Sequence, residues 1–125
     1  MGALPRDSGQ DDPLNKVLRE YIEEFPGMKA AILVSDQGLT ISSATALDVD
    51  VDVAIVAALV VETVTSAERF GLQVDGGFLK TMSIEFEGLT VVLTPFTPDV
   101  MLALVASSDT LGERSGSPLL GHFHR

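Results

Sequence analysis

The segment 28–43 constrains the fold of this 125-residue chain more than any other part of the sequence. An apolar run from Ala30 to Val34 is followed by a Ser-Asp-Gln-Gly tetrapeptide, which ends at Gly38, and then by a second short segment, 39–43. Glycine adopts a positive φ angle without steric cost, so Asp and Gly between two apolar runs favour a β-hairpin. The sequence therefore predicts antiparallel strands at 28–35 and 39–43.

One helix is predicted on each side of this hairpin. The Asp12-Pro13 pair is typical of a helix start, with a capping carboxylate before a proline at the first helical position. Apolar residues then recur at helical spacing up to the Pro26-Gly27 pair, where the first helix should end. The second helix should run from about residue 53 to about 70, with Gly71 as its C-terminal cap.

Three more strands are predicted after the second helix, at 78–86, 89–95 and 100–106. The strands at 28–35 and 100–106 are apolar on both faces, which is typical of strands at the centre of a sheet. The strand at 78–86 has one largely polar face, and this pattern suits an edge. The order of elements is α-ββ-α-βββ.

The composition indicates one globular domain, with boundaries at 12–111. We expect a disordered leader at 1–11, and an irregular tail at 112–125 because three glycines and a proline interrupt it. The chain has no cysteine, its N-terminus does not resemble a signal peptide, and its longest apolar run, 53–61, is too short to span a bilayer. These features favour a cytoplasmic protein.

The chain is acidic, with 18 carboxylates against 8 basic residues and a formal net charge of −10. Nucleic acids and anionic membrane surfaces both select positively charged partners, so neither is expected here. Two interpretations remain. The acidity either steers the chain toward basic patches on other proteins or only keeps it soluble.

The second helix is apolar on more than one side. One side, which includes Val56 and Val60, forms an ordinary core stripe. The opposite side becomes polar only in its second half and places Ile55 and Leu59, with Ala58, where charged residues would be expected. Such a patch indicates contact with a subunit or partner, although scattered apolar surface residues are also normal.

No residue pattern predicts a catalytic, cofactor or metal site. Asp48, Asp50 and Asp52 alternate as in a calcium loop, but the required glycine and bidentate glutamate are missing, so they are better explained as helix-start charges. His122 and His124 could form a metal-binding pair, yet both fall in the irregular tail. We therefore do not expect an enzyme.

The sequence resembles the Roadblock (dynein light chain) family, including its bacterial members of the mutual gliding protein B-like group. The resemblance covers about residues 14–112. It depends on the order and spacing of several short segments, none of which is a catalytic motif: residues 30–39 with Ser42-Ser43, Ser66-Ala67-Glu68 in the second helix, Leu93-Thr94-Pro95 with Asp99, residues 102–105, and residues 108–112.

This resemblance implies an α+β sandwich with a five-stranded antiparallel sheet. The long helix would cover one face, the N-terminal helix the other, and the family's third helix would be short or absent because of the glycines after residue 111. In the family, two subunits pair the strand at 78–86 edge to edge and pack their second helices together. The pair serves as a scaffold for a small Ras-like GTPase and has no active site.

The sequence thus predicts a non-catalytic homodimeric interaction platform that binds and regulates a small Ras-like GTPase. The alternative is a small-molecule sensor or cargo adaptor on the same scaffold. No cofactor, nucleic acid or membrane insertion is expected. The residues predicted for self-association are Val56, Val60, Lys80, Thr81, Met82, Ser83 and Ile84, and those predicted for binding the GTPase are Ile55, Leu59, Glu62 and Arg69.

Overall fold

The computed structural model describes residues 12–47 and 49–108. The predicted leader at 1–11, the tail at 112–125 with its two histidines, the predicted loss of a third helix and the role of Asp48 all lie outside these residues. The elements are two helices and five strands: α2 (Pro13–Glu24), β1 (Met28–Ser35), β2 (Thr40–Thr45), α3 (Val53–Gln73), β3 (Met82–Glu85), β4 (Leu89–Thr97) and β5 (Val100–Ser107).

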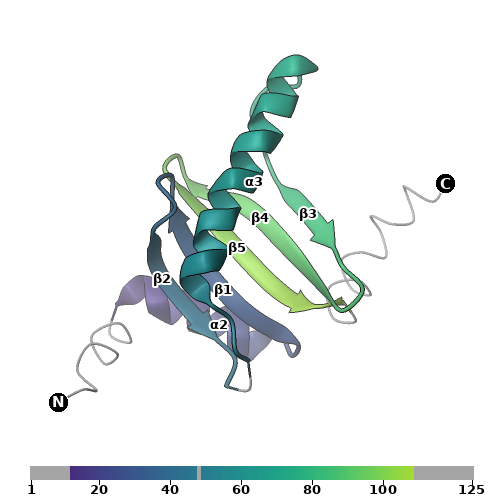
Figure 1. Cartoon of the computed structure of the whole chain (residues 1–125). Coiled ribbons are helices and arrows are strands. Elements are labelled where there is room, and N and C mark those ends of the chain that lie inside the picture. Colours follow the sequence, from purple (N-terminus) through teal and green to yellow (C-terminus); the bar gives the residue numbers. More distant parts are fainter. Residues whose placement is uncertain (1–11, 48, 109–125) are drawn as a thin grey trace.

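The five strands form one antiparallel sheet in the order β2-β1-β5-β4-β3. The long helix α3 crosses one face of the sheet and α2 covers part of the other (Figure 1). This arrangement confirms the predicted α+β fold and the order α-ββ-α-βββ. It also confirms that β5 and β1 are internal strands and that β3 is an edge strand.

Two apolar layers explain why β1 is hydrophobic throughout. On the α3 face, Ile32 packs in a cluster with Val60 and Val64 of the helix. On the α2 face, Leu33 packs with Leu18. Because successive side chains of a strand point to opposite faces, a strand between two helices needs apolar residues at every position.

Capping carboxylates begin both helices. The Asp12 carboxylate accepts a hydrogen bond from the backbone N–H of Leu14 at 3.1 Å, and Pro13 follows it as the first helical residue. The Asp52 carboxylate accepts one from the backbone N–H of Ile55 at 3.2 Å. These bonds satisfy N–H groups that have no partner inside a helix, and they confirm the predicted start at Asp12 and the helix-start role of Asp52.

Several predicted boundaries are wrong, among them the end of β4, which reaches Thr97 and not residue 95. Helix α3 continues to Gln73, and Gly71 is part of its last turn, where an added Cβ would lie 3.3 Å from the carbonyl oxygen of Gly77. Gly71 therefore permits close packing of the returning chain and does not act as a cap. Strand β3 spans only 82–85, against the predicted 78–86, and β2 reaches Thr45, two residues beyond its predicted end.

No helix in the described ranges is long and apolar enough to cross a membrane.

Candidate protein-interaction surface

The outer side of β3 presents backbone groups that pair with no other strand within residues 12–47 and 49–108. Met82 lies opposite Leu93 and Ile84 opposite Val91, and the Phe86 N–H donates to the Leu89 carbonyl at 2.7 Å. In an antiparallel ladder the residues that bond the neighbour alternate with those that do not. The N–H and C=O groups of Ser83 and Glu85 therefore point away from β4, toward the open edge.

A shallow hollow joins this edge to α3. Its volume is about 690 Å³, and one side chain of β3 and one face of the second half of the helix line it. Most of these residues are small, apolar or uncharged, which suits close contact with another protein. The lining residues are Glu62, Thr63, Ser66, Ala67, Phe70, Gly71 and Met82.

Apolar side chains remain uncovered along α3 and just beyond it. Ile55 and Leu59 are 57% and 53% exposed in the first half of the helix, and Phe70 is 70% exposed in the second half. The last turns of α3 extend past the sheet (Figure 1), and Leu72 near the helix end and Phe78 after it are more exposed still. A run of exposed large apolar residues on one helix commonly marks contact with another protein.

The residues predicted for self-association fall into two groups. Val60 is only 4% exposed and belongs to the core, and half-buried Val56 packs against the same core, so both contact the sheet of their own chain. The other predicted residues, 80–84, lie at or just before β3. Among them Met82 faces the hollow and Ser83 presents its backbone at the edge.

Lys80 and Thr81 precede β3 and help to hold the chain in place before the strand. The Lys80 carbonyl accepts a hydrogen bond from the Thr94 hydroxyl at 3.4 Å, and the Thr81 hydroxyl donates to the Leu93 carbonyl at 3.3 Å. Both residues are exposed. The Lys80 side chain does not line the hollow beside β3.

All four residues predicted for the GTPase lie on α3 and are exposed: Ile55, Leu59, Glu62 and Arg69. The structure also exposes Phe70 and Phe78. The sequence predicts Phe70 at the end of the helix and Phe78 inside a strand. The available signal was the Phe-Gly-Leu-Gln-Val run after residue 69, in which apolar residues continue beyond the core stripe of the helix. The prediction that Gly71 ends the helix concealed this signal.

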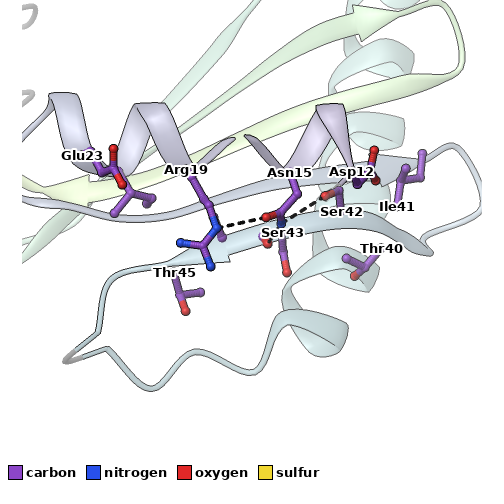
Figure 2. Close-up of a pocket in the computed structure, with 11 residues that line it drawn as sticks. Asp12, Asn15, Arg19, Glu23, Thr40, Ile41, Ser42, Ser43 and Thr45 are labelled. Atoms are coloured by element: carbon purple, nitrogen blue, oxygen red, sulfur yellow. Dashed lines mark hydrogen bonds between the residues drawn. The ribbon is translucent and has the colours of Figure 1, made fainter. Parts of the chain in front are cut away.

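The opposite edge of the sheet has a different surface. A polar groove of about 490 Å³ runs between α2 and β2 (Figure 2). Asn15 is buried at its base, and its side-chain amide donates to the Ser43 carbonyl at 2.8 Å and to the Ser42 hydroxyl at 3.5 Å. The Asn15 side-chain oxygen accepts a hydrogen bond from Arg19 Nε at 3.2 Å. These contacts tie the helix to the edge strand.

Nothing in the described ranges forms a metal site. No three His, Asp or Glu side chains lie close enough together there to hold an ion. The described surface offers an open strand edge beside a helix with exposed apolar residues, and such features are typical of protein-interaction surfaces.

Comparison with known proteins identifies the family of the domain. The family model of the Roadblock/LC7 domain matches residues 14–106. No curated protein matches the chain in sequence.

Solved structures share the fold at low sequence identity. A Roadblock/LC7 domain from Streptomyces avermitilis has a TM-score of 0.69 and 21% identity, covering 77% of this chain and 79% of that one. The gliding protein MglB from Thermus thermophilus gives 0.70 and 18%, with 76% and 71% covered. Myxococcus xanthus MglB gives 0.69 and 20%, with 78% and 71% covered.

The family model covers almost all of the described residues, and the observed order of helices and strands agrees with the fold of these structures. The chain therefore belongs to the Roadblock/LC7 family.

Proposed function

We propose that this protein is a non-catalytic homodimeric platform that binds and regulates a small Ras-like GTPase. The observation that carries the proposal is the open β3 edge beside the uncovered apolar face of α3. An open edge strand promotes pairing with a further strand, and an exposed apolar patch promotes burial against another protein. The two features together fit a scaffold for protein interaction.

Self-association would pair β3 with β3 of a second copy. Within β3, Ser83 and Glu85 are the residues that direct backbone groups outward, so an antiparallel pairing of this strand should place these positions opposite each other. A two-fold axis at Ile84 puts Ser83 opposite Glu85 of the second copy and uses all the outward groups of both residues. It also keeps the two Glu85 carboxylates from facing each other directly, which would be unfavourable.

The two halves of α3 would then take different partners. The second half borders the hollow beside β3, so Ser66 and Phe70 would contact the second copy. The helix also contacts β1 and β2, the strands farthest from β3, and its first half carries Ile55 and Leu59. These two side chains would remain open in the dimer and available to the GTPase.

The likeness of the sequence to the Roadblock family is what implies a Ras-like GTPase as partner, and with this partner the platform would work in the cytoplasm. The platform would regulate the GTPase by positioning the catalytic groups of the GTPase itself. Arg69 lies in the second half of α3, but it is exposed and does not line the hollow assigned to the second copy, so we assign it as the cation of the GTPase contact.

A pull-down from native lysate tests the proposal. The purified chain is incubated with lysate and a non-hydrolysable GTP analogue or GDP, and retained proteins are identified by mass spectrometry. We expect a Ras-like GTPase in one nucleotide state. The variant Leu59→Glu should lose it, while Leu39→Glu, which places the same charge at an exposed residue outside this surface, should retain it.

Two outcomes would contradict the proposal. Absence of a GTPase in both nucleotide states would favour the cargo adaptor, and equal retention by the two variants would discard the assignment of Leu59. The sensor alternative requires a closed apolar cavity between the sheet and the first helix. Leu18 fills that position against Leu33, and the groove beside α2 is open and mostly polar, so the structure does not support a sensor there.

A further inference from the structure

A second cavity lies on the other flank of α3, away from the hollow at β3. Its volume is about 480 Å³, within the usual range for pockets that bind small groups. Helix α3, the turn between β1 and β2, the turn between β4 and β5, and the chain just before β3 form its walls. Most of its lining side chains are apolar: Val61, Val64, Phe78, Leu79, Pro95, Pro98, Val100 and Met101.

Two of these walls are held firmly in place. The Asp36 N–H donates to the Asp99 carbonyl at 3.0 Å, which ties the two hairpin turns together. Gly38, with φ +84°, lies so close to α3 that an added Cβ would be 3.6 Å from Val61 Cγ2 and 3.7 Å from Ala58 Cα. The cavity therefore has a built frame and does not depend on the placement of one side chain.

The charges around this cavity have one sign. Asp36, Glu68 and Asp99 are the ionisable residues of its lining, and no basic residue lines it. Within residues 12–47 and 49–108, these three carboxylates neither form an ion pair nor accept a hydrogen bond. The groups in this part of the chain do not form a metal cluster. The site thus offers negative charge above an apolar floor.

Phe78 extends the apolar surface beyond the mouth of the cavity. Its side chain lines the cavity while remaining 99% exposed. An aromatic ring left in water next to an apolar pocket is suited to cover an apolar group that continues outside the pocket. The apolar surface available to a ligand therefore extends beyond the cavity, and a protein segment with more than one contacting residue could use it.

We propose that this cavity receives an arginine or lysine side chain, flanked by an apolar residue, from an exposed segment of a partner protein. The apolar stem of such a side chain would pack on Val64 and Met101, and its cationic head would meet the carboxylates at the rim. The apolar neighbour would pack on Phe78. The cavity lies on the flank of α3 opposite the hollow, so it stays open whether or not β3 pairs.

Selection of short random peptides displayed on phage, against the full-length chain, tests this proposal. Counter-selection uses the variant Asp36→Asn/Glu68→Gln/Asp99→Asn, which removes the three charges and keeps the side-chain shapes. We expect the enriched peptides to share a basic residue beside an apolar one. Synthetic copies should bind the variant at least about tenfold more weakly, as for the loss of a charge-assisted hydrogen bond.

A matched control removes the same charge elsewhere. The variant Glu20→Gln/Glu23→Gln/Glu24→Gln neutralises three exposed carboxylates on α2, and it should bind the peptides like the unmodified chain. Cooperative thermal unfolding of both variants shows that each is folded. Failure to enrich any peptide, enrichment without a basic residue, or equal binding by the first variant would overturn the proposal. The test does not depend on dimer formation or on a GTPase.

Discussion

The two edges of the sheet are built in opposite ways. At β2, the Ala46 N–H donates to the Lys29 carbonyl, so the alternation of the ladder turns the Ser43 carbonyl away from β1. The Asn15 amide donates to that outward carbonyl at 2.8 Å (Figure 2). At β3, no side chain in the described ranges bonds to the outward groups of Ser83 and Glu85.

The regularity of the two edge strands differs as well. The register between β1 and β2 shifts next to Leu33, where Ile41 is an extra residue on β2. A bulge of this kind twists an edge and discourages further pairing. The ladder between β3 and β4 has no shift, and an apolar hollow lies beside it. This difference between the two edges supports the proposal that β3 pairs with a second copy.

The largest expected effect comes from a proline at the open edge. Ser83→Pro removes an outward N–H from each copy, and two lost hydrogen bonds with unsatisfied carbonyls amount to about 3 kcal/mol, or roughly a hundredfold weaker self-association. Light scattering should show a monomer. The matched control Ser43→Pro removes an outward N–H at the β2 edge and should leave the mass unchanged. Equal masses for both variants would refute pairing through β3.

Position 83 is the right place for this test because of the alternation of the ladder. A proline at Met82, which the sequence also predicts for self-association, removes an N–H at a position that bonds to β4 opposite Leu93. Met82→Pro would therefore damage the sheet within one chain and would not separate unfolding from dissociation.

The second effect concerns the protected edge at β2, where a substitution should remove the contact that covers it. Asn15→Ala removes the amide that satisfies the Ser43 carbonyl and leaves the Ser42 hydroxyl without this donor. Loss of a buried hydrogen-bonding group should lower the free energy of unfolding by about 1–3 kcal/mol. Chemical denaturation measures this loss. An unchanged midpoint would mean that the Asn15 contacts do not stabilise the β2 edge.

A smaller effect concerns the apolar surface beside β3. Phe70→Ala removes an exposed ring from the hollow, so it should weaken self-association by about tenfold and leave the stability of the monomer nearly unchanged. Analytical ultracentrifugation over a range of concentrations measures the change. Leu39→Ala, an equally simple truncation of an exposed residue beside β2, is the control. If both truncations weaken association alike, the effect is not specific to the hollow.

The smallest expected effect is on stability, and it concerns β4, the strand next to the open edge strand β3. Thr90 of β4 is buried opposite Glu85 of β3, and its hydroxyl finds no hydrogen-bond partner within the described ranges. Thr90→Val replaces this hydroxyl by a methyl group of similar size, so the free energy of unfolding should rise by about 1 kcal/mol. Thermal unfolding checks the sign. A less stable variant would show that the hydroxyl is satisfied in solution.

Local patterns predicted most of the fold. The β1–β2 hairpin follows from its Asp and Gly, the helix starts follow from Asp12 and Asp52, and the internal strands follow from their apolar faces. These are short-range properties, set by backbone conformation and by hydrogen bonds between near neighbours in the chain. The end of α3 was not predictable in this way, because a glycine that usually caps a helix serves here for close packing against Gly77.

The interaction surface was predicted only in part. Ile55 and Leu59 stood out because large apolar residues replaced charged ones at helical spacing, and both are exposed. Val60 had the same apolar character but lies in the core. The helical spacing had already placed Val60 in a core stripe, and the position of the sheet shows that this stripe is the covered side of the helix.

The sequence by itself determined the identity and order of the elements and the acidic charge of the chain. Tertiary structure alone decided which edge is protected, because the contact of Asn15 with Ser43 joins residues 28 positions apart. It also decided that Asp36, Glu68 and Asp99 share one cavity. Both outcomes depend on how helices and turns pack on the sheet, and such distances in space are not encoded in any local stretch of the chain.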